Sequence, residues 1–292
     1  MAFYLAVANR KGGVGKSTIS VMIAHAAAVW GGQRVLLLDL DSQCNASLIL
    51  LGGQGWSEAR KAGQTISDYF YDLFDGTNPK PRDYLIHGAG DVAGAADGRP
   101  ANLSVLPGSL LLEDIQGELF MREAGNGAGD PEAVGLRVRS KLQRLMTRFG
   151  KEFDVVILDC APGLSFAALA ALHAADKVLV PFRPDYVSQL AVDRVALLIE
   201  EKRNLDDLEE IPFDKRRYTC LANYVRNIGP ERVLVDEIAD IHPMLETMLP
   251  QRDSIANAFD WVGQRRSMEQ KYGDSIEDAR KLYQEVAAMM PA

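Results

Sequence analysis

Cysteine pairs, long apolar runs and clustered basic charge are all scarce in this sequence. Cys44, Cys160 and Cys220 lie far apart with no C-x-x-C spacing, which argues against a zinc site or a disulfide framework. No apolar run approaches the roughly 18 residues that a membrane-spanning helix needs, and the N-terminus lacks the pattern of a secretion signal. We therefore expect a cytoplasmic protein without stable membrane insertion.

The charge balance excludes a uniformly basic nucleic-acid-binding protein. The 292 residues carry a formal net charge of -8, with 47% hydrophobic and 25% charged content. Because phosphate contacts need clustered lysine and arginine, any DNA binding must be local or arise from assembly. The length allows one large α/β domain or two small ones, and we predict a single domain over residues 1–292.

Apolar, β-rich runs alternate with helical patterns along the chain, which is typical of a parallel-sheet α/β fold. Residues 16–30 and 188–204 have the apolar spacing of helices. The expected strands are mostly continuous apolar runs, as in strands covered on both faces. They are residues 3–8, 34–41, 103–107, 154–159, 177–182, 218–225 and 246–250. The sequence predicts a mostly parallel, twisted sheet with helices on both faces.

Two stretches interrupt the alternation, near residues 52–100 and 123–135. Both are rich in glycine, alanine and aspartate. This composition is typical of surface loops, so we expect loop insertions there and no separate domain.

The stretch "NRKGGVGKST", residues 9–18, lies between the first expected strand and the first expected helix. A glycine-rich turn in that place gathers backbone N–H groups and a helix N-terminus around one point, which favours an anion. Lys16 is placed to neutralise nucleotide phosphates, and Ser17 to offer its hydroxyl to Mg²⁺. The predicted nucleotide-binding residues are Gly12, Gly13, Val14, Gly15, Lys16, Ser17 and Thr18.

Carboxylates follow two further expected strands, with Asp39 and Asp41 after one and Asp159 at the end of another. Ligands of open parallel sheets bind beyond the carboxyl ends of the strands, so these acids should converge on the loop. Mg²⁺ needs few protein ligands, and Asp159 suits an outer-sphere partner of an ion bound by Ser17. We predict Asp41 at the metal and as the group that positions or deprotonates the attacking water.

Three motifs occur in a fixed order: K-G-G-V-G-K-S, then D-L-D-S-Q after the second strand, then L-D-C-A-P at the end of a later strand. Together they resemble the motifs of the ParA/MinD family of P-loop ATPases, whose loop is called the deviant Walker A motif. Segments such as "KVLVPFRPDYVSQLAVDRV" and "LPQRDSIANAF" also look like ParA segments. The resemblance implies a P-loop NTPase fold, ATP and Mg²⁺ as ligands, and slow, partner-stimulated ATP hydrolysis.

Lys11 matches the family's signature lysine, which reaches across a nucleotide-sandwiched dimer to the phosphates bound by the other subunit. The resemblance therefore implies catalytic roles for Lys11, Lys16 and Asp41, and a homodimer when ATP is bound. Such a lysine couples nucleotide state to assembly.

Other positions of the family are matched less completely. Asn223, Pro250 and Gln251 stand where family members hold adenine, and an amide can pair with a base edge. The sequence departs from the family pattern at Ser42, Cys44 and Ala161, which puts the switch-loop geometry in question without removing a charged catalytic group.

Within the family, the sequence looks most like ParA proteins of the Soj type. Its cysteines are not placed to hold an iron–sulfur cluster, and the polar face of its last helical stretch is mostly acidic, unlike the basic membrane helix of MinD. We expect that stretch to pack against the core. The first expected strand starts at residue 3, so we expect no N-terminal helix-turn-helix domain. Candidates for non-specific DNA contact are Arg226, Arg265, Arg266 and Lys271.

These features predict an ATP-dependent dimerisation switch for partition or positioning of DNA or a protein cargo. A ParB-like or other adaptor would be its partner, and it would act near the nucleoid. One alternative is an ATP-dependent regulatory protein of the MinD-like group that acts on cell-pole, flagellar or envelope machinery. Another is a metabolic ligase or kinase on the same fold.

Overall fold

The computed structural model describes residues 2–94, 99–125, 130–226 and 228–291. Its strands form one sheet in the order β3-β4-β2-β5-β1-β6-β7-β8. Among these described strands, β3 runs antiparallel to β4 and the other neighbours pair in parallel. The strands are β1 (Phe3–Val7), β2 (Val35–Leu40), β3 (Ile86–His87), β4 (Leu103–Leu106), β5 (Val155–Cys160), β6 (Lys177–Phe182), β7 (Tyr218–Val225) and β8 (Leu249–Pro250). The predicted fold class is confirmed.

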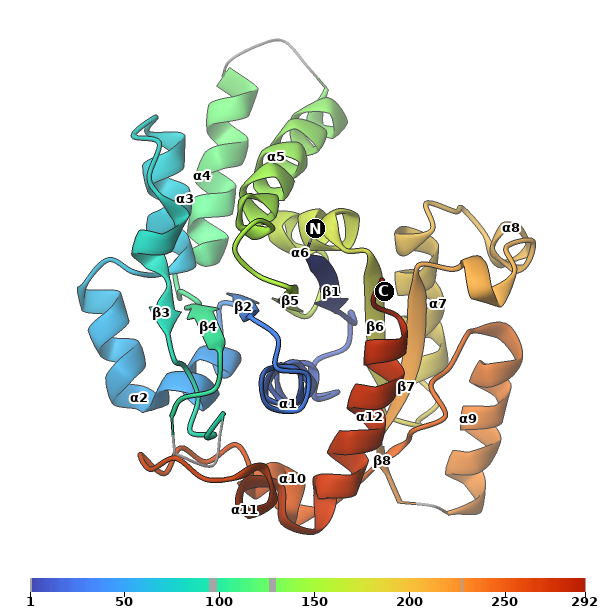
Figure 1. Cartoon of the computed structure of the whole chain (residues 1–292). Coiled ribbons are helices and arrows are strands. Elements are labelled where there is room, and N and C mark those ends of the chain that lie inside the picture. Colours follow the sequence, from blue (N-terminus) through green and yellow to red (C-terminus); the bar gives the residue numbers. More distant parts are fainter. Residues whose placement is uncertain (1, 95–98, 126–129, 227, 292) are drawn as a thin grey trace.

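Helices cover both faces of the sheet (Figure 1). One face packs against α1 (Lys16–Val29), α2 (Asn45–Lys61), α10 (Asp253–Asn257), α11 (Met268–Tyr272) and α12 (Ile276–Ala288). The other face packs against α3 (Ile66–Phe74), α4 (Leu112–Gly125), α5 (Pro131–Met146), α6 (Phe166–Ala174), α7 (Ser188–Ile199), α8 (Leu205–Glu209) and α9 (Gly229–Ile241).

Alternate residues of each strand supply the two apolar cores. In β1, Leu5 and Val7 pack on the side of α1, whereas Tyr4 and Ala6 pack on the opposite side. Because both faces are covered, the central strands are fully buried, which explains their continuous apolar sequence.

The expected insertions differ most from the structure. In the first, α2 continues to Lys61 across a kink at Gly52, and α3, the 3₁₀ turn Pro81–Tyr84 and β3 follow. The prediction of a loop near 52–100 was therefore wrong for most of its length. In the second, α4 covers residues 123–125 and α5 covers residues 131–135. Residue 130 precedes α5, and between it and α4 lie residues 126–129. The latter, like residues 95–98, lie outside the described residues.

Smaller differences lie at element ends. The predicted helix over 188–204 stops at Ile199, and Glu201 then takes a left-handed φ of 54°, which ends the helix. The last expected strand shortens to Leu249–Pro250. The C-terminal helix α12 packs on α1 through Ala279, Leu282 and Val286, as expected. Among the described residues, no helix combines the length and apolarity needed to cross a membrane.

Candidate functional site

The phosphate loop joins β1 to α1 at the carboxyl edge of the sheet. Two of its glycines, Gly13 and Gly15, have positive φ values of 72° and 85°, which side-chain-bearing residues rarely adopt. A Cβ atom at Gly15 would also lie 2.4 Å from Nδ2 of Asn223. Backbone conformation and close packing therefore both require glycine at this position.

The sheet register brings the predicted acids to the loop. Asp159 is opposite Val7 of β1 on one side and Asp39 of β2 on the other. The hydroxyl of Ser20 donates to Oδ1 of Asp159 at 2.9 Å, but the buried Oδ2 atom has no hydrogen-bond partner among the described residues. Burying an unpaired carboxylate oxygen is costly, and the hydroxyl of Ser17 acts to lower the pKa of Asp159, so the two side chains suit a shared cationic ligand.

The same residues fit a magnesium ion. No group of three or more His, Cys, Asp or Glu side chains in the described ranges could hold a metal ion by itself. Mg²⁺ does not need such a cage, because it keeps several waters and uses one or two protein oxygens together with substrate phosphates. Ser17 and Asp41 line the cleft beside the loop, and the orphaned oxygen of Asp159 is close by.

Asp39 differs from its neighbours because its carboxylate is satisfied within the chain. It accepts from the hydroxyl and the backbone N–H of Ser47 at 2.6 and 2.8 Å, and from the backbone N–H of Asp41 at 3.2 Å. Asp39 therefore shapes the start of α2. Burial, and repulsion from nearby carboxylates, raise the pKa values of both Asp39 and Asp159.

Lys16 is a buried cation surrounded by backbone carbonyls and acids. Its Nζ atom donates to the carbonyl of Lys11 at 3.1 Å. Burial lowers the pKa of Lys16, while Asp159 and Asp41 oppose this effect. Only 6% of the residue is exposed, so its charge acts at short range on whatever occupies the loop.

Lys11 is held away from its own phosphate site. Its ammonium group pairs with Asp185, which lies between β6 and α7. The backbone N–H of Lys11 donates to Oδ1 of Asn9 at 3.0 Å, and the amide of Asn9 donates to the carbonyl of Pro181 at 2.8 Å. The loop's second lysine is thus fixed by the β6–α7 connection.

A cleft of about 560 Å³ opens beside the loop. Loop residues, Asp41 and Gln43 form its polar part. The lining residues that were not predicted as site residues from the sequence are Gln43, Asn45, Leu48, Ile49, Pro162, Tyr224 and Phe259. Gln43 and Asn45 could have been found from their place directly after Asp41. Phe259 carries no local signal, since folding alone brings it here.

The predicted adenine contacts lie near this cleft but do not line it. The amide of Asn223 donates to the carbonyl of Val14 at 2.9 Å and accepts from the N–H of Tyr224 at 2.9 Å. Asn223 therefore supports the phosphate loop from behind. Pro250 and Gln251 follow on the neighbouring strand, β8. Their contact with adenine stays a prediction.

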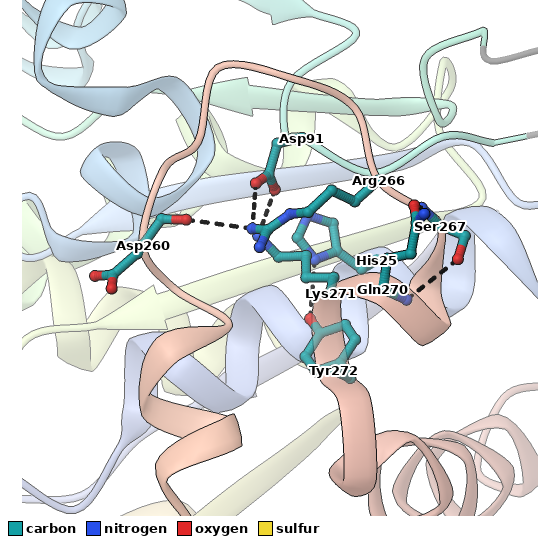
Figure 2. Close-up of polar contacts among 8 residues, drawn as sticks. All are labelled: His25, Asp91, Asp260, Arg266, Ser267, Gln270, Lys271 and Tyr272. Carbon is teal, nitrogen blue, oxygen red and sulfur yellow. Dashed lines mark hydrogen bonds and ion pairs between the residues drawn. The ribbon is translucent and has the colours of Figure 1, made fainter.

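The structure corrects two of the predicted DNA contacts (Figure 2). Lys271 has no exposed side-chain surface and pairs with the buried carboxylate of Asp91, so it cannot reach a DNA backbone. Arg266 binds the same carboxylate at 2.6 Å, with 21% of its side chain exposed. Arg226 pairs with Glu231 at 2.6 Å, with 61% exposed, and Arg265 lies on the surface.

The comparisons with known proteins agree with this geometry. A family model described as "AAA domain" matches residues 3–208. The chain belongs to this family, and to its ParA/MinD group of P-loop ATPases. In this group the chain is 30% identical to the chromosome partitioning protein ParA of Caulobacter vibrioides, over 68% of this chain and 62% of that protein.

Two further relatives are similar to this chain. The chain is 32% identical to the chromosome-partitioning ATPase Soj of Thermus thermophilus, again over 68% of this chain and 62% of the relative. It is 27% identical to an uncharacterized protein of Pseudomonas putida, over 88% of this chain and 84% of the relative. The match thus spans less than two thirds of the named partition proteins.

Two solved structures resemble the fold of this chain over most of its length. MinD of Pyrococcus horikoshii, solved with Mg-ADP, superposes with a TM-score of 0.65 at 18% identity, covering 98% of this chain and 96% of that one. A cobyrinic acid a,c-diamide synthase of Mycobacterium smegmatis, solved with an ATP analogue and magnesium, has a TM-score of 0.62 at 25% identity, covering 87% and 89%.

Proposed function

We propose that this ParA/MinD-family chain is a Mg²⁺-dependent ATP hydrolase whose bound ATP closes a homodimer. The observation that carries the proposal is the pair of lysines on one phosphate loop. Lys16 is buried beside the acids of its own site, whereas Lys11 is held by Asp185 at the surface. Because Lys11 lies at the surface, it can bind the ATP of a second subunit once Asp185 releases it.

The residues of the cleft divide the chemistry among them. Lys16 and the loop N–H groups bind the phosphates, and Ser17 with Asp159 would hold Mg²⁺, which would neutralise phosphate charge. Asp41 orients the attacking water and accepts its proton. The buried carboxylates and low exposure of the site strengthen each of these electrostatic contacts.

Exposed apolar side chains next to Asp185 support a dimer at this face. Tyr186, Val187 and Leu190 are 87%, 64% and 53% exposed, directly after the residue that holds Lys11. Apolar side chains gathered on one surface are typical of interaction sites. On dimerisation, Lys11 exchanges Asp185 for the phosphates in the partner subunit.

The wider role follows from the family and stays a proposal. The switch partitions or positions a cargo in the cytoplasm near the nucleoid, and a ParB-like or other adaptor stimulates hydrolysis. The remaining candidates for non-specific DNA contact are Arg226 and Arg265, doubled in the dimer. Binding to duplex DNA at two salt concentrations, with and without ATP, tests this part.

Phosphate release from Mg-ATP tests the enzymatic proposal. We expect slow hydrolysis by the wild type and at least about a 100-fold loss in Asp41→Asn, because the group that positions the attacking water is removed. Wild-type protein that binds ATP without hydrolysing it would contradict an ATPase. Hydrolysis that requires a small-molecule carboxylate acceptor would instead favour a ligase, as the name of the Mycobacterium smegmatis relative suggests.

A further inference from the structure

A second buried polar cluster joins the segment after β3 to Arg266 and Lys271 and shares no residue with the phosphate loop (Figure 2). Its centre is the carboxylate of Asp91, on the segment that follows β3. One oxygen pairs with Lys271, and the other accepts from Nη2 of Arg266 at 2.6 Å. Asp91 is 1% exposed, so this is a buried carboxylate held by two cations.

Backbone hydrogen bonds join the same two segments. The N–H of Arg266 donates to the carbonyl of Asp91 at 2.8 Å, and the N–H of Ala93 donates to the carbonyl of Arg266 at 2.9 Å. Arg266 also donates to the carbonyl of Asp260 at 3.2 Å. One guanidinium thus connects Asp91 to the residue that directly follows Phe259.

A second path runs from the cluster to Phe259 through Tyr272. The hydroxyl of Tyr272 is 2.9 Å from Nδ1 of His25 in α1, and the ring of Tyr272 meets Phe259 edge to face with centroids 6.4 Å apart. Tyr272 directly follows Lys271. The first path ends at Asp260 and the second at its neighbour Phe259, which lines the nucleotide cleft.

The segments that carry Phe259 and Asp91 both contact α2. Trp261 lies against Gly52, where a Cβ atom would come within 2.5 Å of its ring. The N–H of Gly90, next to Asp91, donates to the carbonyl of Leu50 at 2.9 Å. Since α2 also carries Leu48 and Ile49 of the cleft, the cluster and its neighbours fix the part of the apolar wall formed by these two residues and Phe259.

We propose that Asp91, Lys271 and Arg266 form a positioning cluster for the apolar wall of the nucleotide cleft, and so set how strongly the site prefers a complete nucleotide to bare polyphosphate. Phosphates are bound by the loop, which the cluster does not touch. An aromatic and aliphatic wall suits a base or ribose. The proposal rests on nucleotide binding at this cleft.

Calorimetric titration with Mg-ATP and with Mg-tripolyphosphate tests the proposal. The wild type is expected to bind ATP more tightly than tripolyphosphate. Asp91→Asn should weaken ATP binding about tenfold, as expected for one lost aromatic contact with a base, and leave tripolyphosphate binding unchanged. Arg266→Lys keeps a cation beside Asp91 but loses the hydrogen bond to the carbonyl of Asp260. This variant should show a smaller loss of ATP affinity in the same direction, and it replaces Asp91→Asn if that variant does not fold.

The chain contains a matched control for a purely structural effect. Glu123 is 6% exposed and pairs with Lys141 and Arg137, away from the cleft. Glu123→Gln also breaks a buried carboxylate between two cations, so it should lower stability while the ratio of the two affinities stays at the wild-type value.

A double variant tests whether the cluster acts through Phe259. If it does, Asp91→Asn combined with Phe259→Leu weakens ATP binding no more than the stronger single change, because coupled residues are not additive. Equal weakening of ATP and tripolyphosphate by Asp91→Asn, or the same ratio change in Glu123→Gln, would overturn the inference alone. Wild-type protein that binds neither compound would overturn the proposed function as well.

Discussion

Two buried ionic clusters adjoin α1 and have opposite charge balance. At its start, the carboxylates of Asp41 and Asp159 act on Lys16, Asp39 lies opposite Asp159 in the sheet, and one oxygen of Asp159 has no partner among the described atoms. Further along α1, near His25, two cations bind the single carboxylate of Asp91.

The pKa values follow the same division. Burial and the neighbouring carboxylate Asp39 raise the pKa of Asp159. Burial also acts to raise the pKa of Asp91, but Lys271 and Arg266 outweigh it, and the result is a lowered pKa. The two carboxylates thus differ, since Asp159 has an unpaired buried oxygen and a raised pKa, whereas both oxygens of Asp91 are paired with cations and its pKa is lowered.

The largest effect is expected at the phosphate loop. Lys16→Ala should weaken ATP binding about 100-fold, because charge-assisted hydrogen bonds to phosphate are lost from a buried site. Lys61→Ala, at the exposed end of α2, is the matched control and should bind like the wild type. Titration with a fluorescent ATP analogue measures both, and equal affinities would contradict the loop's assignment.

The two clusters should respond to charge removal with opposite signs. Lys271→Met should lower the free energy of unfolding by about 3 kcal/mol, because Asp91 stays buried with one cation fewer. Asp159→Asn should raise the stability of the nucleotide-free protein by about 1 kcal/mol at pH 7. Folding raises the pKa of Asp159, so its ionised form costs stability there.

Urea denaturation without nucleotide measures this pair of variants. Mg-ATP should then stabilise the wild type but not Asp159→Asn, which has lost its contribution to the metal site. Destabilisation of the nucleotide-free protein by both changes would remove the distinction between the two clusters.

His25 should make the protein acid-sensitive. Burial, and then the charge of Lys271, lower its pKa from 6.5 to about 3, so folded His25 stays neutral where the unfolded chain takes up a proton. Its contribution is complete above about pH 6.5 and declines by about 1.4 kcal/mol per pH unit as the pH falls toward 3. Asp91, Arg266 and Tyr272 also face the ring.

His25→Asn keeps a polar atom toward Tyr272 and removes this titration. Its stability should therefore fall less steeply than that of the wild type between pH 6.5 and 4.5, as measured by urea denaturation at each pH. Parallel curves for the two proteins would show that His25 takes up its proton over the same pH range in the folded and unfolded states, which would contradict a lowered pKa.

The smallest effect is expected at the surface pair of Lys11 and Asp185. Their side chains are 27% and 44% exposed, so the pair contributes less than about 1 kcal/mol. Asp185→Asn should release Lys11 and shift ATP-dependent self-association to a protein concentration about threefold lower. Light scattering over a concentration series measures the shift, and weaker association in the variant would contradict a restraining role for Asp185.

Features that are continuous in sequence were predictable. The central strands are unbroken apolar runs, and the phosphate loop is a single stretch of residues 9–18. The helix α3 was missed although Thr65 and Asp68 form a capping box, because the surrounding glycine-rich composition suggested a loop. The strand β3, with two residues, offers too little periodicity to recognise.

Features built from distant residues were not predictable. Lys271 was expected at the surface because its partner Asp91 lies 180 residues earlier in the chain. Phe259 lies at the cleft, where its ring meets Tyr272 and the adjacent Asp260 accepts from Arg266. The sequence thus predicted the glycine-rich loop and the acids that the sheet brings beside it, and folding was needed to define the apolar wall of the cleft.

The mass of the particle in solution with Mg-ATP or Mg-ADP tests the central claim most directly. Sedimentation velocity should show a dimer for the wild type with Mg-ATP, and a monomer with Mg-ADP. Lys11→Ala should bind ATP yet remain monomeric, because the variant lacks the lysine that would reach across the interface to the ATP of the other subunit. A Lys11→Ala protein that dimerises with ATP as well as the wild type would contradict the account.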